Sequence, residues 1–187
     1  MNSMILLRAD GLNGGTMIMV AKRVDSHRFL DGIAKRAMKR WAVLPRETAA
    51  PWTPLARPLS KCTVSLVCSA AIALKTDRPF DPEIERRDPW FSDPSYRVLP
   101  RTARTGDIHV CHLHINPVFA EQDLNSVLPV ERLDELAEPG EIGAAAPSHY
   151  SYMGYTLRPD RLLRESVPAM VRQLREEHVD VVLLVPV

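Results

Sequence analysis

Apolar residues recur every three or four positions in two stretches of the chain, and this spacing predicts two long amphipathic helices. The first covers residues 26–44, with Ser26 at the N-cap position. The second covers residues 160–178, where Pro168 removes a backbone donor and predicts a kink near Arg164.

Runs rich in β-branched residues predict buried strands over 63–69, 107–115 and 179–185, with a shorter helix over 129–138. The last run follows its helix almost directly and is nearly all apolar, as is typical of parallel strands covered on both faces. This strand–helix–strand order predicts an α/β fold, a mostly parallel sheet flanked by helices. Because the sequence stops two residues after the last strand, we expect the fold to be incomplete at the C-terminus.

The chain divides into three parts by composition. Residues 1–18 are rich in glycine and methionine. We expect that they are disordered, or that the start codon is wrongly assigned and translation begins at Met17 or Met19. Residues 19–58 hold the first helix and a proline-rich connector, and residues 59–187 form a single α/β domain. Within that domain, the polar, proline-containing stretch over residues 75–106 predicts a long, ordered loop.

Charge and cysteine content narrow the function classes. The 187 residues carry 24 Lys and Arg against 23 Asp and Glu, so the basic surplus of a nucleic-acid-binding protein is missing. No apolar run approaches the roughly 20 residues that span a bilayer, and no signal peptide begins the chain. Three cysteines without CxxC spacing predict reduced thiols in the cytoplasm. We expect no metal or organic cofactor, and neither nucleic acid nor membrane as a partner.

Histidines provide the main candidate chemistry. His112 and His114 alternate along the strand predicted over 107–115, so both imidazoles share one face. They can be hydrogen-bonded polar residues at a strand end, or line a substrate pocket and donate protons. With Cys111 and His149 they can also form a metal site, although no fourth ligand spacing is evident.

Further candidate pocket residues lie in two later segments. Asp123 and Asn125 precede the helix over 129–138, and capping or closing a turn is the favoured role over catalysis. Ser151 and Gly154 belong to a segment that forms either a pocket wall or a tight connector, and the glycine indicates a close backbone approach. Arg86, Arg87 and Arg97 are candidates for binding a carboxylate substrate, and the favoured alternative is that they are solvated loop arginines.

Several segments, collinear from about residue 19 to the end, resemble the selenoprotein B family of glycine, sarcosine, betaine and D-proline reductases, in particular its shorter bacterial members. The matching segments are residues 24–29, 51–55, 93–97, 112–114, 123–129, 140–143, 148–155 and 179–187.

The resemblance implies a redox motif directly after the last strand, with selenocysteine or cysteine first and another cysteine a few residues later. The catalytic residue would then follow Val187, and we expect that the chain is truncated there because a UGA selenocysteine codon is read as a stop. The implied reaction is the thiol- or selenol-dependent reductive cleavage of a small amino-acid-like substrate, with a disulfide as product. Implied partners are other reductase subunits or a second copy of the chain.

Three functions stay open on the sequence alone. The first is this oxidoreductase subunit, and the second is a non-catalytic binding or assembly module with the same fold. The third, ranked well behind, is a metal-dependent hydrolase built on His112, His114 and His149.

Overall fold

The computed structural model describes residues 32–33, 36–37, 54–81, 83, 87–88 and 92–187. The predictions for residues 1–18 and for most of 19–58 lie outside these ranges. The strands are β1 (Thr63–Cys68), β2 (Ile72–Leu74), β3 (Tyr96–Pro100), β4 (Ile108–Val110), β5 (Ala144–Ala145), β6 (Ser148–Tyr152) and β7 (Val181–Val185). The helices are α3 (Pro117–Gln122), α4 (Val130–Ala137) and α5 (Val167–Glu176), with a π-helical turn (Leu162–Ser166) before α5 and short 3-10 turns at Leu59–Lys61, Thr105–Asp107 and Leu124–Ser126.

β1 is the centre of a five-stranded sheet and pairs in parallel with three strands. β7 lies along one side of β1, in a register that runs from Val64 opposite Val181 to Cys68 opposite Val185. β5 and β6 share the other side, and β3 pairs antiparallel with the outer edge of β6. The predicted α/β fold, a mostly parallel sheet flanked by helices, is confirmed.

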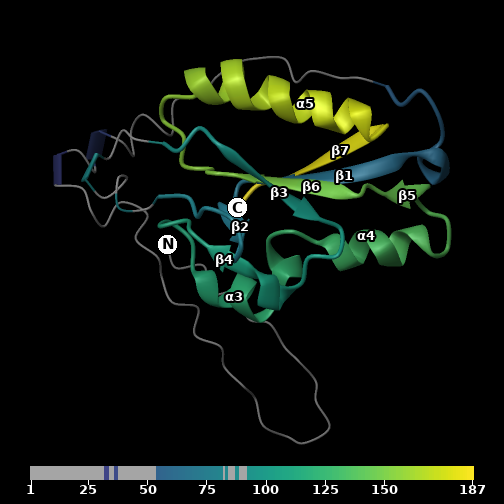
Figure 1. Ribbon diagram of the computed structural model, residues 1–187, viewed down its shortest axis with the longest axis horizontal. Coiled ribbons are helices and arrows are strands. Elements are labelled where there is room, and N and C mark those ends of the chain that lie inside the picture. Colours follow the sequence, from purple (N-terminus) through teal and green to yellow (C-terminus); the bar gives the residue numbers. More distant parts are fainter. Residues whose placement is uncertain (1–31, 34–35, 38–53, 82, 84–86, 89–91) are drawn as a thin grey trace, which may run out of the picture.

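Successive residues of β1 point to opposite faces of the sheet, and each face has its own core. Leu66 and Cys68 belong to a large apolar cluster with residues of α3, α4 and β2. Val67 packs on the other face with Tyr150 of β6 and with Met170 of α5. Figure 1 shows the resulting layers, with α5 over one face of the sheet and α3, α4 and the β2–β4 pair over the other.

The small antiparallel sheet of β2 and β4 corrects the strand predicted over 107–115 and the shared face predicted for His112 and His114. Ala71 has a positive φ of 50°, so the chain turns there and β2 does not continue β1. β4 ends at Val110, and the amide of Cys111 makes one more bond in the same antiparallel register, to the carbonyl of Ala71, before the chain turns away. His112 therefore lies in the following turn, and the shared strand face predicted for the two histidines is wrong.

The strands β3 and β6 were not predicted. Residues 96–100 fall inside the segment expected to be a loop, and the edge position of β3 tolerates its terminal Pro100. β6 reads as polar, yet His149, Tyr150 and Ser151 are all fully buried in it. His149 Nδ1 accepts the Leu66 amide hydrogen and Ser151 Oγ accepts the Ile72 amide hydrogen, whereas the Tyr150 hydroxyl has no hydrogen-bond partner in the described structure. A sequence pattern does not reveal these partners.

The last helix and strand are where the sequence pattern predicted them. Pro168 has no amide to donate to Arg164, and the helix accommodates this defect as the π-helical turn over Leu162–Ser166. β7 is parallel as predicted, but it is not covered on both faces. Leu183 and Leu184 are 48% and 69% exposed, because β7 is an edge strand in the described structure.

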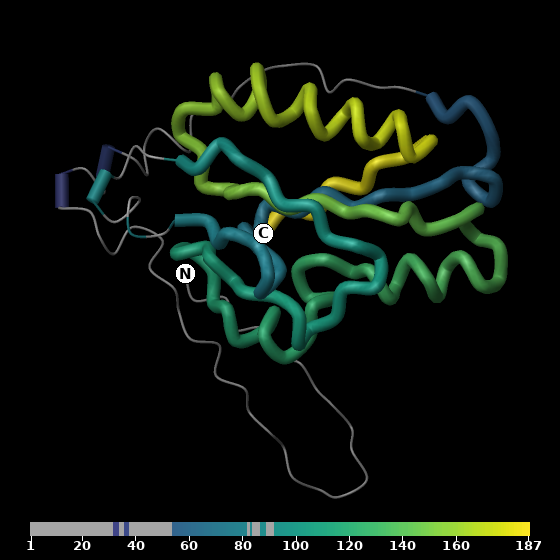
Figure 2. The backbone as a smooth tube through the Cα atoms, in the orientation of Figure 1, coloured from purple at the N-terminus to yellow at the C-terminus, as the bar shows by residue number. Residues whose placement is uncertain are grey.

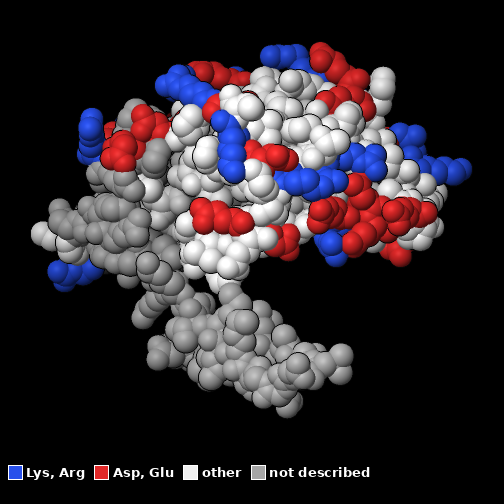
Figure 3. Space-filling model, turned by 60° about the horizontal axis from the view of Figure 1, so that its bottom comes forward, with Lys and Arg blue, Asp and Glu red and all other residues white. Residues whose placement is uncertain are grey.

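Charged side chains of both signs are interspersed on the face shown in Figure 3. None of the helices described here is both long and apolar enough to cross a membrane.

Candidate functional site at the carboxyl edge of the sheet

The carboxyl ends of β1, β6 and β7 meet at one place, which we call the carboxyl edge and define by Ser69, Gly154 and Val187. The amide of Val187 donates to Oγ of Ser69 at 2.9 Å, and the amide of Gly154 donates to the Ser69 carbonyl at 3.0 Å. The amide of Ser69 in turn donates to Val185 at 3.2 Å. Figure 2 shows the C-terminal end of the trace beside the segment that joins β1 to β2. Ligands of open α/β sheets bind at this kind of edge.

Only glycine fits at position 154, because Ser69 at the end of β1 lies directly against it. A Cβ atom there would lie 2.7 Å from the Ser69 carbonyl oxygen and 2.8 Å from its Cβ. These distances are shorter than real carbon contacts, so a larger residue would push the end of β6 away from β1. The close approach expected at Gly154 from the sequence is confirmed.

Two histidines and a tyrosine stack beside this edge. Tyr155 follows Gly154 directly, and its ring lies 4.2 Å from the ring of His114. The rings of His114 and His112 are 5.7 Å apart in an edge-to-face arrangement. The turn that carries the histidines is held to the segment after β1 by the bond from the amide of Cys111 to Ala71.

The two histidines differ in environment. Nδ1 of His112 accepts the amide hydrogen of His114 at 3.1 Å, which assigns the proton of the neutral ring to Nε2. Burial, together with the neighbouring His114, lowers the pKa of His112 to about 4, so this imidazole is neutral at pH 7. His114 is only half-buried, and its ring is held between the His112 and Tyr155 rings.

Ser151 and Cys68 lie beneath the edge and serve the fold. Oγ of Ser151 accepts the amide hydrogen of Ile72 at 2.9 Å, where the chain turns from β1 into β2. Burial raises the pKa of the Cys68 thiol, against a smaller opposing effect of its hydrogen bond with Ser151. Burial also raises the pKa of Cys111. Reactive cysteines have the opposite shift, because the thiolate is the nucleophile.

His149 lies at the start of β6, whereas Gly154 follows the end of that strand. Its Nδ1 accepts the amide hydrogen of Leu66 at 3.2 Å, so the imidazole fills the gap between β5 and β6 along β1. Burial lowers the pKa of His149 to about 4. Across the described ranges, no three His, Cys, Asp or Glu side chains converge as a metal-binding group, so the metal-site hypothesis for His112, His114 and His149 gains no support.

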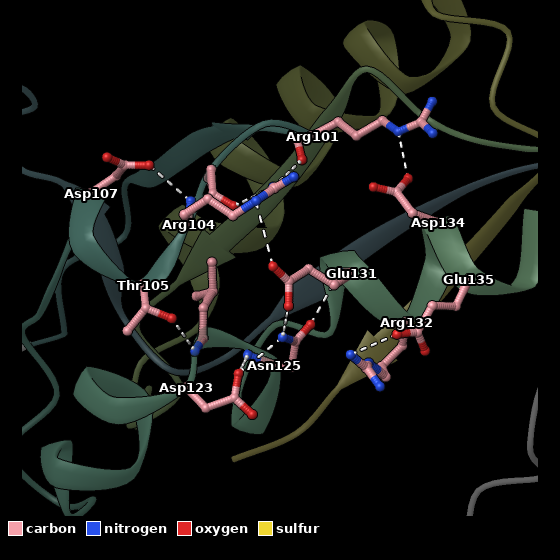
Figure 4. A network of polar contacts seen from close by, with 12 residues as sticks. Arg101, Arg104, Thr105, Asp107, Asp123, Asn125, Glu131, Arg132, Asp134 and Glu135 are labelled. Carbon is pink, nitrogen blue, oxygen red and sulfur yellow. Dashed lines mark hydrogen bonds and ion pairs between the residues drawn. The ribbon is translucent and has the colours of Figure 1, made fainter.

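Asp123 and Asn125 form a capping network at the start of α4 (Figure 4). Asp123 Oδ1 accepts from the backbone amide and the side-chain amide of Asn125, both at 2.9 Å, and these bonds lower the pKa of Asp123. Asn125 also donates to Glu131 at 2.7 Å and accepts the Glu131 amide hydrogen at 3.0 Å. The turn-closing role favoured from the sequence is what the geometry shows for these two residues.

Arg97 holds the segment before β3 in place. Its guanidinium donates to the carbonyls of Arg78, Pro79 and Tyr96 and to Ser95 Oγ, and it stacks at 4.2 Å over the ring of Phe80. These contacts use all three guanidinium nitrogens, so the structure does not support the hypothesis that Arg97 binds a substrate carboxylate.

The sequence did not single out Ser69 or Tyr155. Ser69 closes the predicted strand over 63–69, and the rule that ligands bind at carboxyl edges was the signal that could have identified it. Tyr155 follows the glycine that was singled out, but its pairing with His114 depends on tertiary contacts.

The fold and the carboxyl edge define an α/β protein with a candidate site where its parallel strands end. No protein-family model matches the chain, and no solved structure gives a significant match. It is 34% identical over 133 residues to the D-proline reductase subunit gamma of Acetoanaerobium sticklandii, which is 71% of this chain and 52% of that protein. It is 30% identical over 112 residues to the glycine reductase complex component B subunit gamma of Carboxydothermus hydrogenoformans, which is 59% of this chain and 25% of that protein.

The chain belongs to the family of D-proline and glycine reductase subunits, and the family inferred from the collinear segments is confirmed. It spans about half the length of the D-proline reductase subunit and a quarter of the glycine reductase subunit.

Proposed function

We propose that this chain is part of a thiol- or selenol-dependent reductase that cleaves a C–N bond of a small amino-acid-like substrate. The observation that carries the proposal is the carboxyl edge, where Ser69, Gly154 and Val187 converge beside His114 and Tyr155. The names of the relatives supply the reaction class, since both are reductase subunits.

In this proposal the reactive residue is a selenocysteine or cysteine that follows Val187 in the whole protein, with a second cysteine a few residues later. The direction of β7 supports this position, because the strand delivers the backbone to Ser69 at the carboxyl edge. The thiols within the chain support it as well. Cys62 and Cys68 are buried, and burial raises the pKa of both Cys68 and Cys111.

The reaction consumes two electrons and two protons for each bond cleaved. One C–N bond of the substrate breaks, and a C–H bond and an N–H bond form in its place. A dithiol reductant supplies the electrons and protons and becomes a disulfide, by way of thiol–disulfide or selenenyl-sulfide exchange at the reactive residue.

The histidines have separate roles in this scheme. The leaving nitrogen requires a proton, and a histidine side chain can act as the general acid that donates it. His114 is the proposed donor, because its half-buried ring lies against Tyr155 next to the carboxyl edge. His112 is a positioning residue that receives the His114 amide hydrogen and holds this turn.

Partner subunits are part of the proposal. The relatives are named as subunit gamma of one reductase and as subunit gamma of component B of a reductase complex. By analogy, this chain would assemble with further reductase subunits. Chemistry that starts from reduced thiols also favours the cytoplasm as its compartment.

A non-catalytic binding or assembly module is the second candidate function. It is favoured by one observation, that the two thiols with shifted pKa values, Cys68 and Cys111, are shifted away from the reactive thiolate form. In that case the same edge would bind a ligand or partner without turnover.

The test is turnover by the natural product of the reading frame, isolated with its associated subunits. It would be supplied with a dithiol and, separately, with glycine, sarcosine, betaine and D-proline. We expect one disulfide per C–N bond cleaved with one of these substrates, and a His114→Gln variant at least about 10-fold slower. The matched control is His109→Gln, on the exposed side of β4, which we expect to retain full turnover. Absence of disulfide and amine formation with every substrate would refute the reductase proposal and favour the binding module.

A further inference from the structure

Two polar atoms between α5 and the sheet are fully buried without a hydrogen-bond partner in the described structure. One is the hydroxyl of Tyr150, in the middle of β6, and the other is Oε2 of Glu177, the residue that caps the C-terminal end of α5. Tyr150 itself is 0% exposed. Buried polar atoms without a partner are costly, and in native proteins nearly all of them pair with protein groups or with ordered water.

The direction of α5 relates these two atoms in space. Figure 1 shows that α5 runs toward the start of β7, so the helix is antiparallel to that strand. β7, β1 and β6 are parallel to one another, whereas β3 is antiparallel to β6. The helix α5 therefore runs in the same direction as β3.

Helix and strand spacing then place Glu177 above Tyr150. The Tyr96 hydroxyl of β3 donates to Oε1 of Gln173 at 3.1 Å, which fixes one point of contact between helix and strand. Glu177 lies one helical turn, about 6 Å, beyond Gln173. Val98 lies about 7 Å beyond Tyr96 in the same direction. Since Val98 pairs with Tyr150 across β3 and β6, Glu177 lies over Tyr150.

The two groups are also coupled electrostatically. Burial raises the pKa of Tyr150 to about 12, and the charge of Glu177 adds to this shift. The phenol therefore keeps its proton at neutral pH and is a hydrogen-bond donor. Oε2 of Glu177 is an acceptor, so a donor and an acceptor lie close together without a direct bond between them.

We propose that one buried water molecule bridges the Tyr150 hydroxyl and Glu177 Oε2 and fastens the end of α5 to the sheet. The water accepts the hydroxyl hydrogen of Tyr150 and donates to Glu177, which satisfies both atoms. Tyr96 offers an acceptor for the second water hydrogen, because its own hydroxyl hydrogen is used on Gln173 and its ring lies 6.0 Å from the Tyr150 ring. Buried waters typically make about three such bonds.

A bound cation fits these groups less well than water. A cation would interact with Oε2 of Glu177, but it would leave the hydroxyl hydrogen of Tyr150 without an acceptor. The part of the chain that the structure describes also has no group of three His, Cys, Asp or Glu side chains arranged to hold a metal ion. A donor facing an acceptor is the pair that a single water satisfies.

The bridge acts on the connection between α5 and β7. Glu177 is followed by His178, whose φ is 55°, and the amide of Val179 donates back to the Leu174 carbonyl at 2.9 Å. Asp180 then leads directly into β7. The water therefore holds the end of the helix from which β7 begins, at the opposite end of that strand from the carboxyl edge.

The experiment compares urea unfolding of the parent chain with that of Tyr150→Phe, Glu177→Ala and the double variant. We expect Tyr150→Phe to raise the unfolding equilibrium constant about 5-fold, because a hydrogen-bonded hydroxyl is lost. In the Glu177→Ala background the same change should raise it less than about 2-fold, because the bridge is already broken. The matched controls are Tyr152→Phe, two residues further along β6, and Glu176→Ala, on the exposed residue before Glu177, and both should stay within about 2-fold of the parent.

A second measurement detects the water directly and does not depend on a change in stability. In the NMR spectrum of the parent chain we expect a nuclear Overhauser effect between the Tyr150 hydroxyl proton and a long-lived water. The same effect should be lost in Glu177→Ala and kept in Glu176→Ala.

A Tyr150→Phe chain that is more stable than the parent would overturn the proposal, because the hydroxyl would then be an unpaired buried group whose removal is favourable. Strictly additive effects of the substitutions at positions 150 and 177 would overturn it as well. Stabilisation of the parent chain, but not of Glu177→Ala, by potassium or ammonium chloride over equal tetramethylammonium chloride would also overturn it, and would assign the site to a cation.

Discussion

His149 provides a prediction whose size can be worked out from the structure. Its imidazole accepts the Leu66 amide hydrogen inside the sheet, and burial holds its folded-state pKa at about 4 against 6.5 for the ordinary group. The unfolded chain therefore binds the proton more tightly than the folded one. The stability that the neutral imidazole contributes is complete above about pH 7 and is lost as the pH falls through 6.5 toward 4.

A shift of this size corresponds to about 3 kcal/mol, since one pKa unit is worth about 1.4 kcal/mol. The linkage relation gives a loss of about 1.4 kcal/mol at pH 5.5 and about 2.6 kcal/mol at pH 4.5. His149→Asn should remove this pH-dependent loss, because an amide oxygen can accept the Leu66 hydrogen in place of Nδ1 and does not titrate. His149→Ala should instead lower stability at every pH, by roughly 1–3 kcal/mol for the unpaired amide and more for the cavity.

The assay is urea unfolding followed by circular dichroism at pH 7.5, 5.5 and 4.5. His109→Asn, with an exposed side chain, is the matched control and should follow the parent protein at each pH. His112 contributes a similar pH-dependent loss in all of these chains, so it cancels in the comparison. If the parent and His149→Asn chains lost stability in parallel between pH 7.5 and 4.5, the buried neutral role of His149 would be refuted.

Three further predictions concern the edge, the capping network and the β3 segment. Gly154→Ala should cost about 1–3 kcal/mol of unfolding free energy, because its Cβ collides with Ser69 backbone, whereas Gly106→Ala, with open space around it, should be close to neutral in the same urea assay. Asn125→Ala should cost about 1–2 kcal/mol through its lost bonds to Asp123 and Glu131, while exposed Glu121→Ala should change little; equal thermal midpoints for the two would contradict the capping role. Arg97→Lys should accelerate proteolytic cleavage within residues 78–95, since lysine cannot reproduce the planar fork that binds Arg78 and Pro79 carbonyls, and an unchanged digestion pattern would argue against this role.

The elements that the sequence predicted are those whose own periodicity specifies them. The helix over 160–178 and the strand over 179–185 have clear apolar patterns, and both exist with small shifts of their ends. Where Pro168 predicted a kink near Arg164, the structure has a π-helical turn over Leu162–Ser166. What the pattern could not show is that β7 is an edge strand, because an apolar run looks the same whether or not other elements cover it.

The elements that were missed have polar residues whose partners lie far away in the sequence. Ser151 in β6 binds the Ile72 amide and His149 binds the Leu66 amide, so a polar segment becomes a central strand. The candidate pocket shows the same limit. Gly154 was identified from its residue type, but the separation of His149 from the carboxyl edge follows from the direction of β6, which only the fold shows.

The most direct test of the proposed function is to locate the reactive chalcogen in the natural product of the reading frame. The protein would be treated with a limiting amount of iodoacetamide at about pH 6, where an unperturbed thiol is protonated and a selenolate or low-pKa thiolate is not. Mass spectrometry would then identify the labelled residue. The account predicts labelling of a selenocysteine or cysteine directly after Val187, with Cys62, Cys68 and Cys111 unmodified. Labelling confined to those three cysteines, or a natural protein with no such residue after Val187, would contradict it.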